Sequence, residues 1–150
     1  MNTIFFTKDK FESLKKQYDN LLIERKDAVF HLARAREMGD LKENGYYRAS
    51  KSRLSSIDHS IREVSNFIKY GSVINFVNKG IIEIGSHATL LTNGQLVQYF
   101  IVGKEEADPG IGKISNESPL GRALIGKKTG ETVNLKAPAG EINYKIIKIK

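Results

Sequence analysis

Two acidic residues stand in a short polar stretch, GDLKEN, between two long segments that both have a helical pattern. Asp40 and Glu43 are three residues apart, so their carboxylates can face the same way if the chain there turns into a helix. Carboxylate oxygens are the ligands that a hard cation such as Mg²⁺ prefers. Two ligands on one turn are too few for a stable site, and the spacing therefore predicts at most an incomplete metal site.

The same two residues also have a purely structural interpretation. Asp40 is placed to cap the second helix, and Glu43 to interact with the positive end of its dipole. Spacing alone favours this structural interpretation over metal binding. The two roles are compatible for Asp40.

Basic residues flank the stretch. Six cations and three anions lie between Arg34 and Arg53, within a chain of net charge +7. Arg binds phosphate oxygens through paired hydrogen bonds and Lys acts as a point charge, so these residues are candidates for a phosphate path. The alternative is a solvated helix surface partly paired with Glu37. Tyr46 is a candidate to stack on a base, whereas Tyr47 fits the apolar face of a helix.

The segments on either side must position this stretch. From Phe11 to Ala35 apolar or small residues recur in a 3-4 alternation that is broken only at Arg25, and the alternation resumes over residues 47–68. Such a pattern predicts a coiled-coil seam. Two helices with matched seams and a short connection predict an antiparallel hairpin with its tip at residues 39–47.

The expected helix ends have their own signals. Thr7 is placed to cap the first helix and Gly39 to end it, and the second helix is expected to end near Gly71. The seam uses small residues toward the tip, which predicts a slender end. We expect this hairpin to form an N-terminal domain over residues 1–74, with a linker near 71–80.

The second half of the chain has strand patterning. Asn93-Gly94 is a strong hairpin signal between two β-rich runs. Ser118 and Pro119 predict the cap and first position of a short helix through Leu124. The expected strands are 81–91, 95–102, 131–135 and 142–149, with the polar segment 103–112 as a connection. These features predict a small α+β domain with an antiparallel sheet over residues 75–150.

Composition excludes several classes of protein. The chain of 150 residues has no cysteine, which excludes disulfides and thiolate metal sites. Its apolar runs are too short to span a membrane, and the N-terminus has no signal-peptide pattern, so we expect a cytoplasmic protein. The histidines at 31, 59 and 87 lack metal-ligand spacing. No nucleophile elbow, phosphate-binding loop or dinucleotide fingerprint is present.

Four stretches have a more specific character. They are LARAREMGDLKEN at 32–44, IVGKEEAD at 101–108, ISNESPLGRALIGKKTGE at 114–131 and APAGE at 137–141. Together they resemble the bacterial GreA/GreB family of transcript cleavage factors over nearly the whole chain. The resemblance implies a coiled-coil hairpin followed by an FKBP-like domain, without prolyl isomerase activity.

The resemblance also implies a function. The hairpin would enter the secondary channel of RNA polymerase and stimulate the polymerase's own hydrolysis of backtracked RNA, so the chain itself would not be an enzyme. Asp40 and Glu43 would help to hold the second catalytic Mg²⁺ and order the attacking water. No cofactor would be bound by the chain alone. Leu41, Lys42 and Asn44 complete the matching tip.

Further contacts follow from the same resemblance. A basic patch would contact the 3′ end of the extruded RNA, and its members are Arg34, Arg36, Arg48 and Lys51. Ser118 and Pro119 match the position that docks on a coiled coil at the channel rim. We expect a monomer, because the seam can be satisfied within one chain.

Two alternatives stay open. The family tip commonly continues with Ala, an acidic residue and Tyr, whereas this chain has Gly45, Tyr46 and Tyr47. A channel-binding polymerase inhibitor without cleavage activity is therefore one alternative. A general RNA-binding protein that uses the basic hairpin as an arm is the other, and its binding would fall steeply with salt.

Overall fold

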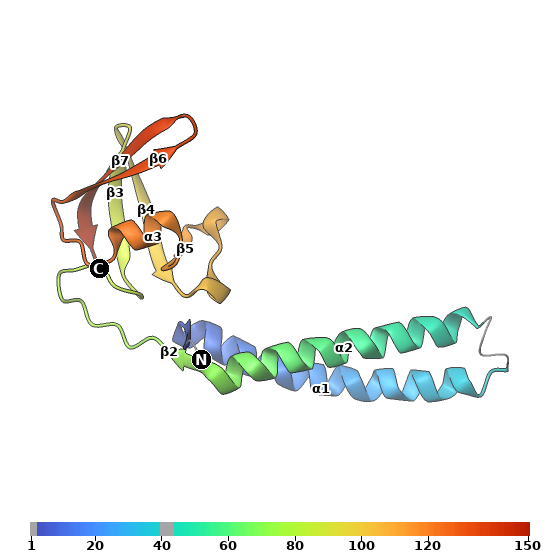
Figure 1. Cartoon of the computed structure of the whole chain (residues 1–150). Coiled ribbons are helices and arrows are strands. Elements are labelled where there is room, and N and C mark those ends of the chain that lie inside the picture. The colour runs from blue at the N-terminus through green and yellow to red at the C-terminus, as the bar shows by residue number, and fades with distance from the viewer. Residues whose placement is uncertain (1–2, 40–43) are drawn as a thin grey trace. The chain divides into compact units, whose positions relative to one another are not determined.

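The computed structural model describes residues 3–39 and 44–150 (Figure 1). The chain divides into two compact units. Phe11–Gly71 forms one unit, and the other combines the residues up to Lys10 with Ser72–Lys150. The first residues of the chain thus belong with its second half rather than with the hairpin.

The two long helices come early in the chain, and most of the strands follow them. In order they are β1 (Ile4–Phe6), α1 (Lys8–Arg36), α2 (Gly45–Tyr70), β2 (Gly71–Val73), β3 (His87–Thr92), β4 (Gln95–Val102), the 3-10 turns η1 (Lys104–Glu106) and η2 (Pro109–Ile111), β5 (Lys113–Ser115), α3 (Pro119–Leu124), β6 (Thr132–Ala137) and β7 (Gly140–Ile149). The predicted order of a helical hairpin followed by a sheet with a short helix is confirmed.

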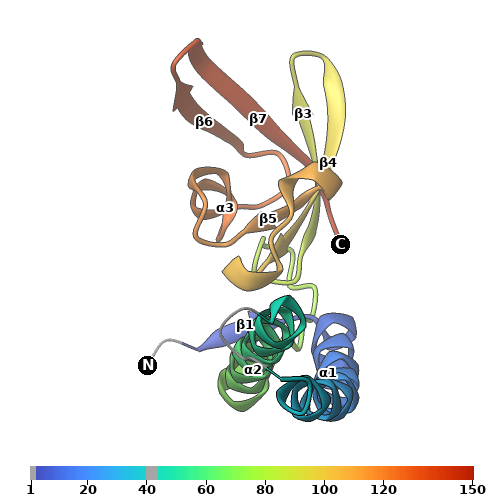
Figure 2. The same cartoon turned by 90° about the vertical axis from the view of Figure 1, so that its right-hand side faces the viewer.

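The helices α1 and α2 lie side by side, as Figure 2 shows in a view nearly along their length. Their buried residues all come from the predicted seam, and they are Leu14, Ala28, Leu32 and Ala35 of α1 with Ser50, Ile57 and Val64 of α2. The coiled-coil prediction is therefore confirmed. Small residues near the turn bury their Cβ atoms without separating the two helices.

At Arg25, where the apolar alternation is broken, an ion pair links the two helices. Arg25 Nε donates to Asp58 Oδ1 across the two helices at 2.6 Å. Both side chains are partly exposed, because a long Arg stem can cover apolar surface while its charged end stays in water. The missing hydrophobe is thus replaced by a polar link between the helices.

The start of α1 is held by a carboxylate from a distant part of the chain. Thr7 caps α1 as predicted, since its Oγ1 accepts from Lys10 N at 3.2 Å. Its own N–H and hydroxyl donate to the buried Glu106 at 2.8 and 2.6 Å. Lys113 Nζ lies 3.3 Å from the same carboxylate. The segment 103–112, expected as a plain connection, therefore contributes a buried anchor.

The larger sheet has five strands in the order β5-β4-β3-β7-β6. The pairs β3–β4, β3–β7 and β6–β7 are antiparallel, as predicted, and β5 adds to β4 in parallel, which makes the sheet mixed. Asn93 and Gly94 both have positive φ, at 50° and 72°. That is the geometry that the Asn-Gly signal predicts for a two-residue hairpin turn.

The predicted strand over 81–91 is too long at its start. Within it, strand β3 begins only at His87, and Ile81 forms an isolated bridge with Lys128. Gly85 has φ +97°, and a Cβ there would lie 2.8 Å from Ile74 Cγ2. The backbone turns at this glycine, so the apolar run cannot be one continuous strand.

The predicted linker over 71–80 is also only partly correct. Its first three residues form β2, which pairs with β1 in a two-stranded sheet. Three-residue strands have no alternation long enough to detect, and β1 and β2 lie far apart in the sequence. Neither strand was predicted.

One apolar core holds the larger unit together. It gathers side chains from all five strands of the larger sheet, from α3 and from the segment before β3: Ile82, Ala88, Leu90, Ile101, Ile114, Leu124, Val133, Ile146 and Ile149. Leu120 and Ala123 of α3 pack against this cluster. The short helix thus covers one face of the sheet.

Candidate functional site at the hairpin turn

The turn joins the end of α1 to the start of α2. The last turn of α1 tightens, because Glu37 N donates to Arg34 O at 3.1 Å and Met38 N to Ala35 O at 3.2 Å. Gly39 follows with φ +100°, a conformation that glycine adopts without strain. This is the helix stop that was predicted there.

Four residues of the predicted tip lie outside the described residues. These are the two carboxylates, Asp40 and Glu43, and the supporting residues Leu41 and Lys42. Among the described residues there is no group of three or more potential metal ligands. The metal-binding and tip-supporting roles predicted for these four residues stay predictions.

Asn44 joins the two helices at the turn. It is the N-cap of α2, and its Oδ1 accepts from Tyr47 N at 3.1 Å. Its Nδ2 donates to Ala35 O at 3.1 Å, in the last turn of α1. The alternative in which Asp40 caps the second helix is therefore wrong. One side chain accepts from a free donor in the first turn of α2 and donates to a carbonyl in the last turn of α1, which also accepts from Met38 N.

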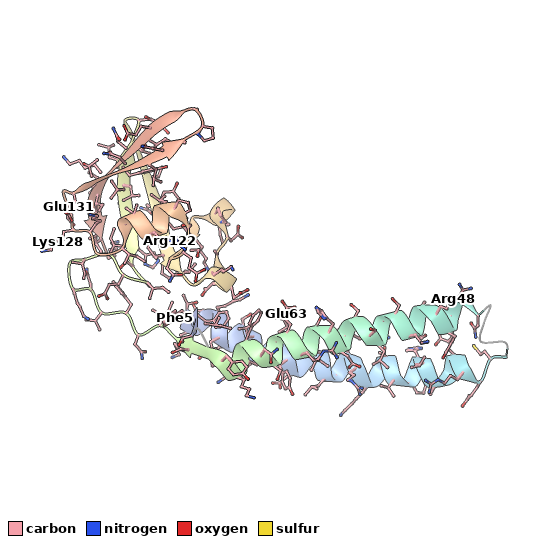
Figure 3. All side chains as sticks on the ribbon, viewed as in Figure 1. Phe5, Arg48, Glu63, Arg122, Lys128 and Glu131 are labelled. Carbon is pink, nitrogen blue, oxygen red and sulfur yellow. The ribbon has the colours of Figure 1, made fainter. Side chains whose placement is uncertain are left out.

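Four exposed cations stand on either side of the turn. Arg34 and Arg36 lie in the last turn of α1, and Arg48 and Lys51 lie near the start of α2, where Figure 3 labels Arg48. None of the ion pairs among the described residues involves them or Glu37. The partial pairing with Glu37 that the alternative expects therefore lacks support within the part of the chain that the structure describes, while its solvated helix surface agrees with the exposure of these cations.

Two of these cations lie over aromatic rings. Lys51 Nζ is 5.4 Å from the ring centre of Tyr47, and the Arg34 guanidinium is 5.7 Å from that of Phe30. Such contacts orient a cation without neutralising its charge. The positive field beside the turn is thereby retained.

Tyr46 takes part in a polar network that sequence reasoning missed. Its hydroxyl lies 2.6 Å from His31 Nδ1, and the His31 Nε2 lies 3.5 Å from Asp27 Oδ1. Arg53 Nη2 donates to the other oxygen of Asp27 at 3.0 Å. The network links α1 to α2 close to the turn. Its signal in the sequence is weak, because no spacing rule relates residues on two separate helices.

The predicted docking position opens α3. Ser118 Oγ accepts from Gly121 N at 3.0 Å and donates to Ser115 O at 2.7 Å. Pro119 follows at the first helical position and is exposed. A Cβ on Gly121 would lie 2.0 Å from Ser115 O, so glycine is required there. The predicted cap and helix are confirmed, while docking stays a prediction.

Comparison with known proteins decides the family. The family model described as "Transcription elongation factor, N-terminal" (GreA_GreB_N) matches residues 4–73, and "Transcription elongation factor, GreA/GreB, C-term" matches residues 77–150. The chain belongs to the GreA/GreB family of transcription elongation factors. The resemblance found in the four sequence stretches is thus confirmed.

Individual relatives are similar in sequence to this chain over nearly their full length. Transcription elongation factor GreA of Lactococcus lactis subsp. cremoris strain SK11 is 40% identical, covering 98% of this chain and 97% of that protein. GreA of Thermomicrobium roseum is 36% identical over 96% of this chain and 95% of that protein. Among solved structures, Gfh1 of Thermus thermophilus has a TM-score of 0.48 at 23% identity, covering 99% of each chain.

Within residues 3–39 and 44–150, no helix is both long and apolar enough to cross a membrane.

Proposed function

We propose that this GreA/GreB-family chain inserts its hairpin into the secondary channel of RNA polymerase and stimulates the polymerase's intrinsic cleavage of backtracked RNA. Asp40 and Glu43 would act at the polymerase centre, while the chain alone would catalyse nothing. This activity would take place in the cytoplasm, with the monomer as the active form.

The arrangement around Asn44 is the observation that carries this proposal. Its side chain bonds Tyr47 N in α2 and Ala35 O in α1, and Asp40 to Glu43 lie directly before it in the sequence. A turn fixed at its base can present short side chains at a defined place, which a tip acting inside another protein requires.

The donor set fits a shared Mg²⁺. Asp40 and Glu43 offer carboxylate oxygens, the ligand type of this ion, but too few of them to hold it without further ligands. When bound, Mg²⁺ would lower the pKa of the attacking water and stabilise the negative charge on the phosphate. The role of Asp40 and Glu43 would be to complete the ligand set and orient that water. The other ligands would come from the polymerase.

The exposed cations suit the substrate. Arg34, Arg36, Arg48 and Lys51 would contact phosphates of the extruded 3′ RNA. Their freedom from ion pairs among the described residues keeps their charges available. Ser118 and Pro119 at the start of α3 would dock on the coiled coil at the channel rim.

One observation favours a second candidate, a channel-binding inhibitor. Helix α2 begins with Gly45, and its first turn contains no acidic residue. Gly favours a helix less than Ala does, and a less acidic tip would recruit a cation less strongly. Binding to polymerase without stimulated cleavage is the behaviour that this candidate predicts.

A cleavage assay separates the two candidates. Stalled, backtracked polymerase carrying 3′-labelled RNA is mixed with the wild-type chain or with an Asp40→Asn, Glu43→Gln double variant, at constant Mg²⁺. We expect short 3′ fragments with wild type only, while the variant still competes for polymerase. The control is Asp19→Asn, Glu24→Gln, which removes two exposed carboxylates of α1 away from the turn and should leave cleavage unchanged. Polymerase binding by wild type without fragment release would reject the proposal in favour of the inhibitor.

A further inference from the structure

The sheet face opposite α3 carries a hollow that the proposed function does not use. Ala88 and Leu90 of β3 point into the core that α3 covers, so His87 and Thr89 point to the other face. The hollow there has a volume of about 550 Å³. Its lining includes His87, Thr89, Gln98, Phe100, Lys148 and Lys150.

Two aromatic rings form a flat surface in this hollow. His87 of β3 and Phe100 of β4 are directly paired in the antiparallel register. Their rings stack with centres 4.0 Å apart and an interplanar angle of 5°. His87 is exposed and Phe100 is half-buried. A rigid, partly exposed pair of stacked rings is a surface on which a further flat ring can stack.

Lysines surround the ring pair. Lys113, Lys148 and Lys150 line the hollow, and only Lys113 of these is in an ion pair among the described residues, with Glu106. Burial, and then the positive charge of Lys150, lower the pKa of His87. The imidazole is therefore held in its neutral form, which suits stacking, while the lysines supply the positive charge.

The positive charge continues along β7. Lys148 pairs with Thr89 and Lys145 with Leu91, so both lie on the same face as His87. From Lys145 to Lys150 the strand covers about 17 Å at roughly 3.4 Å per residue. A row of that length exceeds what one phosphate group needs. It suits a strand of several nucleotides better than a free mononucleotide.

We propose that this hollow binds single-stranded nucleic acid, with a base stacked on the His87–Phe100 pair and backbone phosphates against Lys148 and Lys150. A peptide of Asp and Glu residues would use the lysines but would have no flat ring for the aromatic surface. The combination of stacking surface and cationic row is the general design of sequence-tolerant single-strand binding. None of these residues belongs to the hairpin, so this site goes beyond the proposed function.

The first test measures RNA affinity without polymerase. The parent protein is the full-length chain with Arg34→Gln, Arg36→Gln, Arg48→Gln and Lys51→Gln, so that the hairpin patch does not contribute. A fluorescent uridine decamer is the probe. Adding Lys148→Gln and Lys150→Gln should weaken binding about tenfold. It should also reduce the slope of log affinity against log salt by about 1.4, at roughly 0.7 per phosphate neutralised.

The matched control is Lys104→Gln with Lys128→Gln, which removes the same charge from two exposed lysines outside the hollow. We expect its affinity to stay within about twofold of the parent. Equal losses in the two double variants would mean that only net charge matters, and would overturn the proposal.

The second test concerns stacking. Phe100→Leu keeps an apolar side chain in the sheet but removes the ring, and should weaken binding about tenfold with an unchanged salt slope. If this variant does not fold, the test is an NMR titration of the unmodified chain, in which the amide chemical shifts are followed. Shifts at Thr89 and Lys148 on adding the decamer support the site, and their absence overturns it. Equal affinity for uridine monophosphate, or for an acidic decapeptide, would also overturn the assignment to single-stranded nucleic acid.

Discussion

The side chain of Asn44 bonds one backbone donor and one backbone acceptor. Its oxygen accepts from an N–H at the start of α2, and its amide group donates to a carbonyl at the end of α1. The Tyr47 N–H lies in the first turn of α2, where backbone donors lack intrahelical partners, and Ala35 O in the last turn of α1 also accepts from Met38 N. The proposed roles of Asp40 and Glu43 would therefore depend on a neighbouring residue whose side chain bonds both helix ends.

Two substitutions at Asn44 separate its two bonds. Asn44→Asp keeps the acceptor for Tyr47 N and loses the donor to Ala35 O, whereas Asn44→Ala loses both. We expect a local cost of about 2 kcal/mol for Ala and about 1 kcal/mol for Asp. Hydrogen exchange at the Tyr47 amide measures this locally, without assuming two-state unfolding of the whole chain. Protection of that amide in Asn44→Ala equal to wild type would contradict the capping role.

Sequence patterns located the candidate site but not its internal contacts. GDLKEN stands out because charged residues interrupt two helical patterns. The bonds from Asn44 to Ala35 and from Tyr46 to His31 depend on the distance between two helices, which no local spacing encodes. The cap was assigned to Asp40 because an acidic residue after Gly39 satisfies the capping preference as well as Asn44 does.

At the scale of elements, periodicity decides what is predictable. The hairpin helices and the strands β4 and β7 contain enough repeats to show their period, and all four were predicted close to their observed ends. Strands β1, β2 and β5 have only three residues each, and their partners lie elsewhere in the sequence. Tertiary pairing, rather than local preference, creates them.

The turn η1 has an energetic role that its length does not suggest. Glu106 is 7% exposed and accepts from both the N–H and the hydroxyl of Thr7, where α1 starts. Glu106→Ala leaves these donors and Lys113 without the carboxylate, and we expect a loss of about 3 kcal/mol in the free energy of unfolding. Denaturant unfolding of the full chain measures it.

The same turn supplies the control. Glu105→Ala removes a neighbouring carboxylate that is exposed, and should change the free energy of unfolding by less than about 0.5 kcal/mol. Similar losses for the two variants would show that the helical propensity of η1, and not the bonds to Thr7, determines stability. The comparison thus isolates the anchor at the start of α1.

For the whole molecule, the proposed function divides the work between the two units. The hairpin unit would supply chemistry through Asp40 and Glu43, and the sheet unit would supply affinity through Ser118 and Pro119. A variant that binds polymerase weakly and a variant that is chemically inactive can be told apart by measurement. A loss of affinity is reversed by adding more protein, whereas a loss of chemistry persists when the polymerase is saturated.

Ser118→Ala tests this division. The change removes the cap of α3 and the bond to Ser115 O, at a cost of about 1 kcal/mol, which corresponds to roughly fivefold weaker binding if the docking conformation depends on α3. We expect cleavage by this variant to reach the wild-type rate when the protein is in excess, and cleavage by Asp40→Asn, Glu43→Gln to stay low at every concentration. Thr129→Ala, an exposed hydroxyl in the same unit, should match wild type throughout. A Ser118→Ala defect that persists at saturation would mean that α3 takes part in more than docking, because affinity alone cannot lower the rate of a saturated complex.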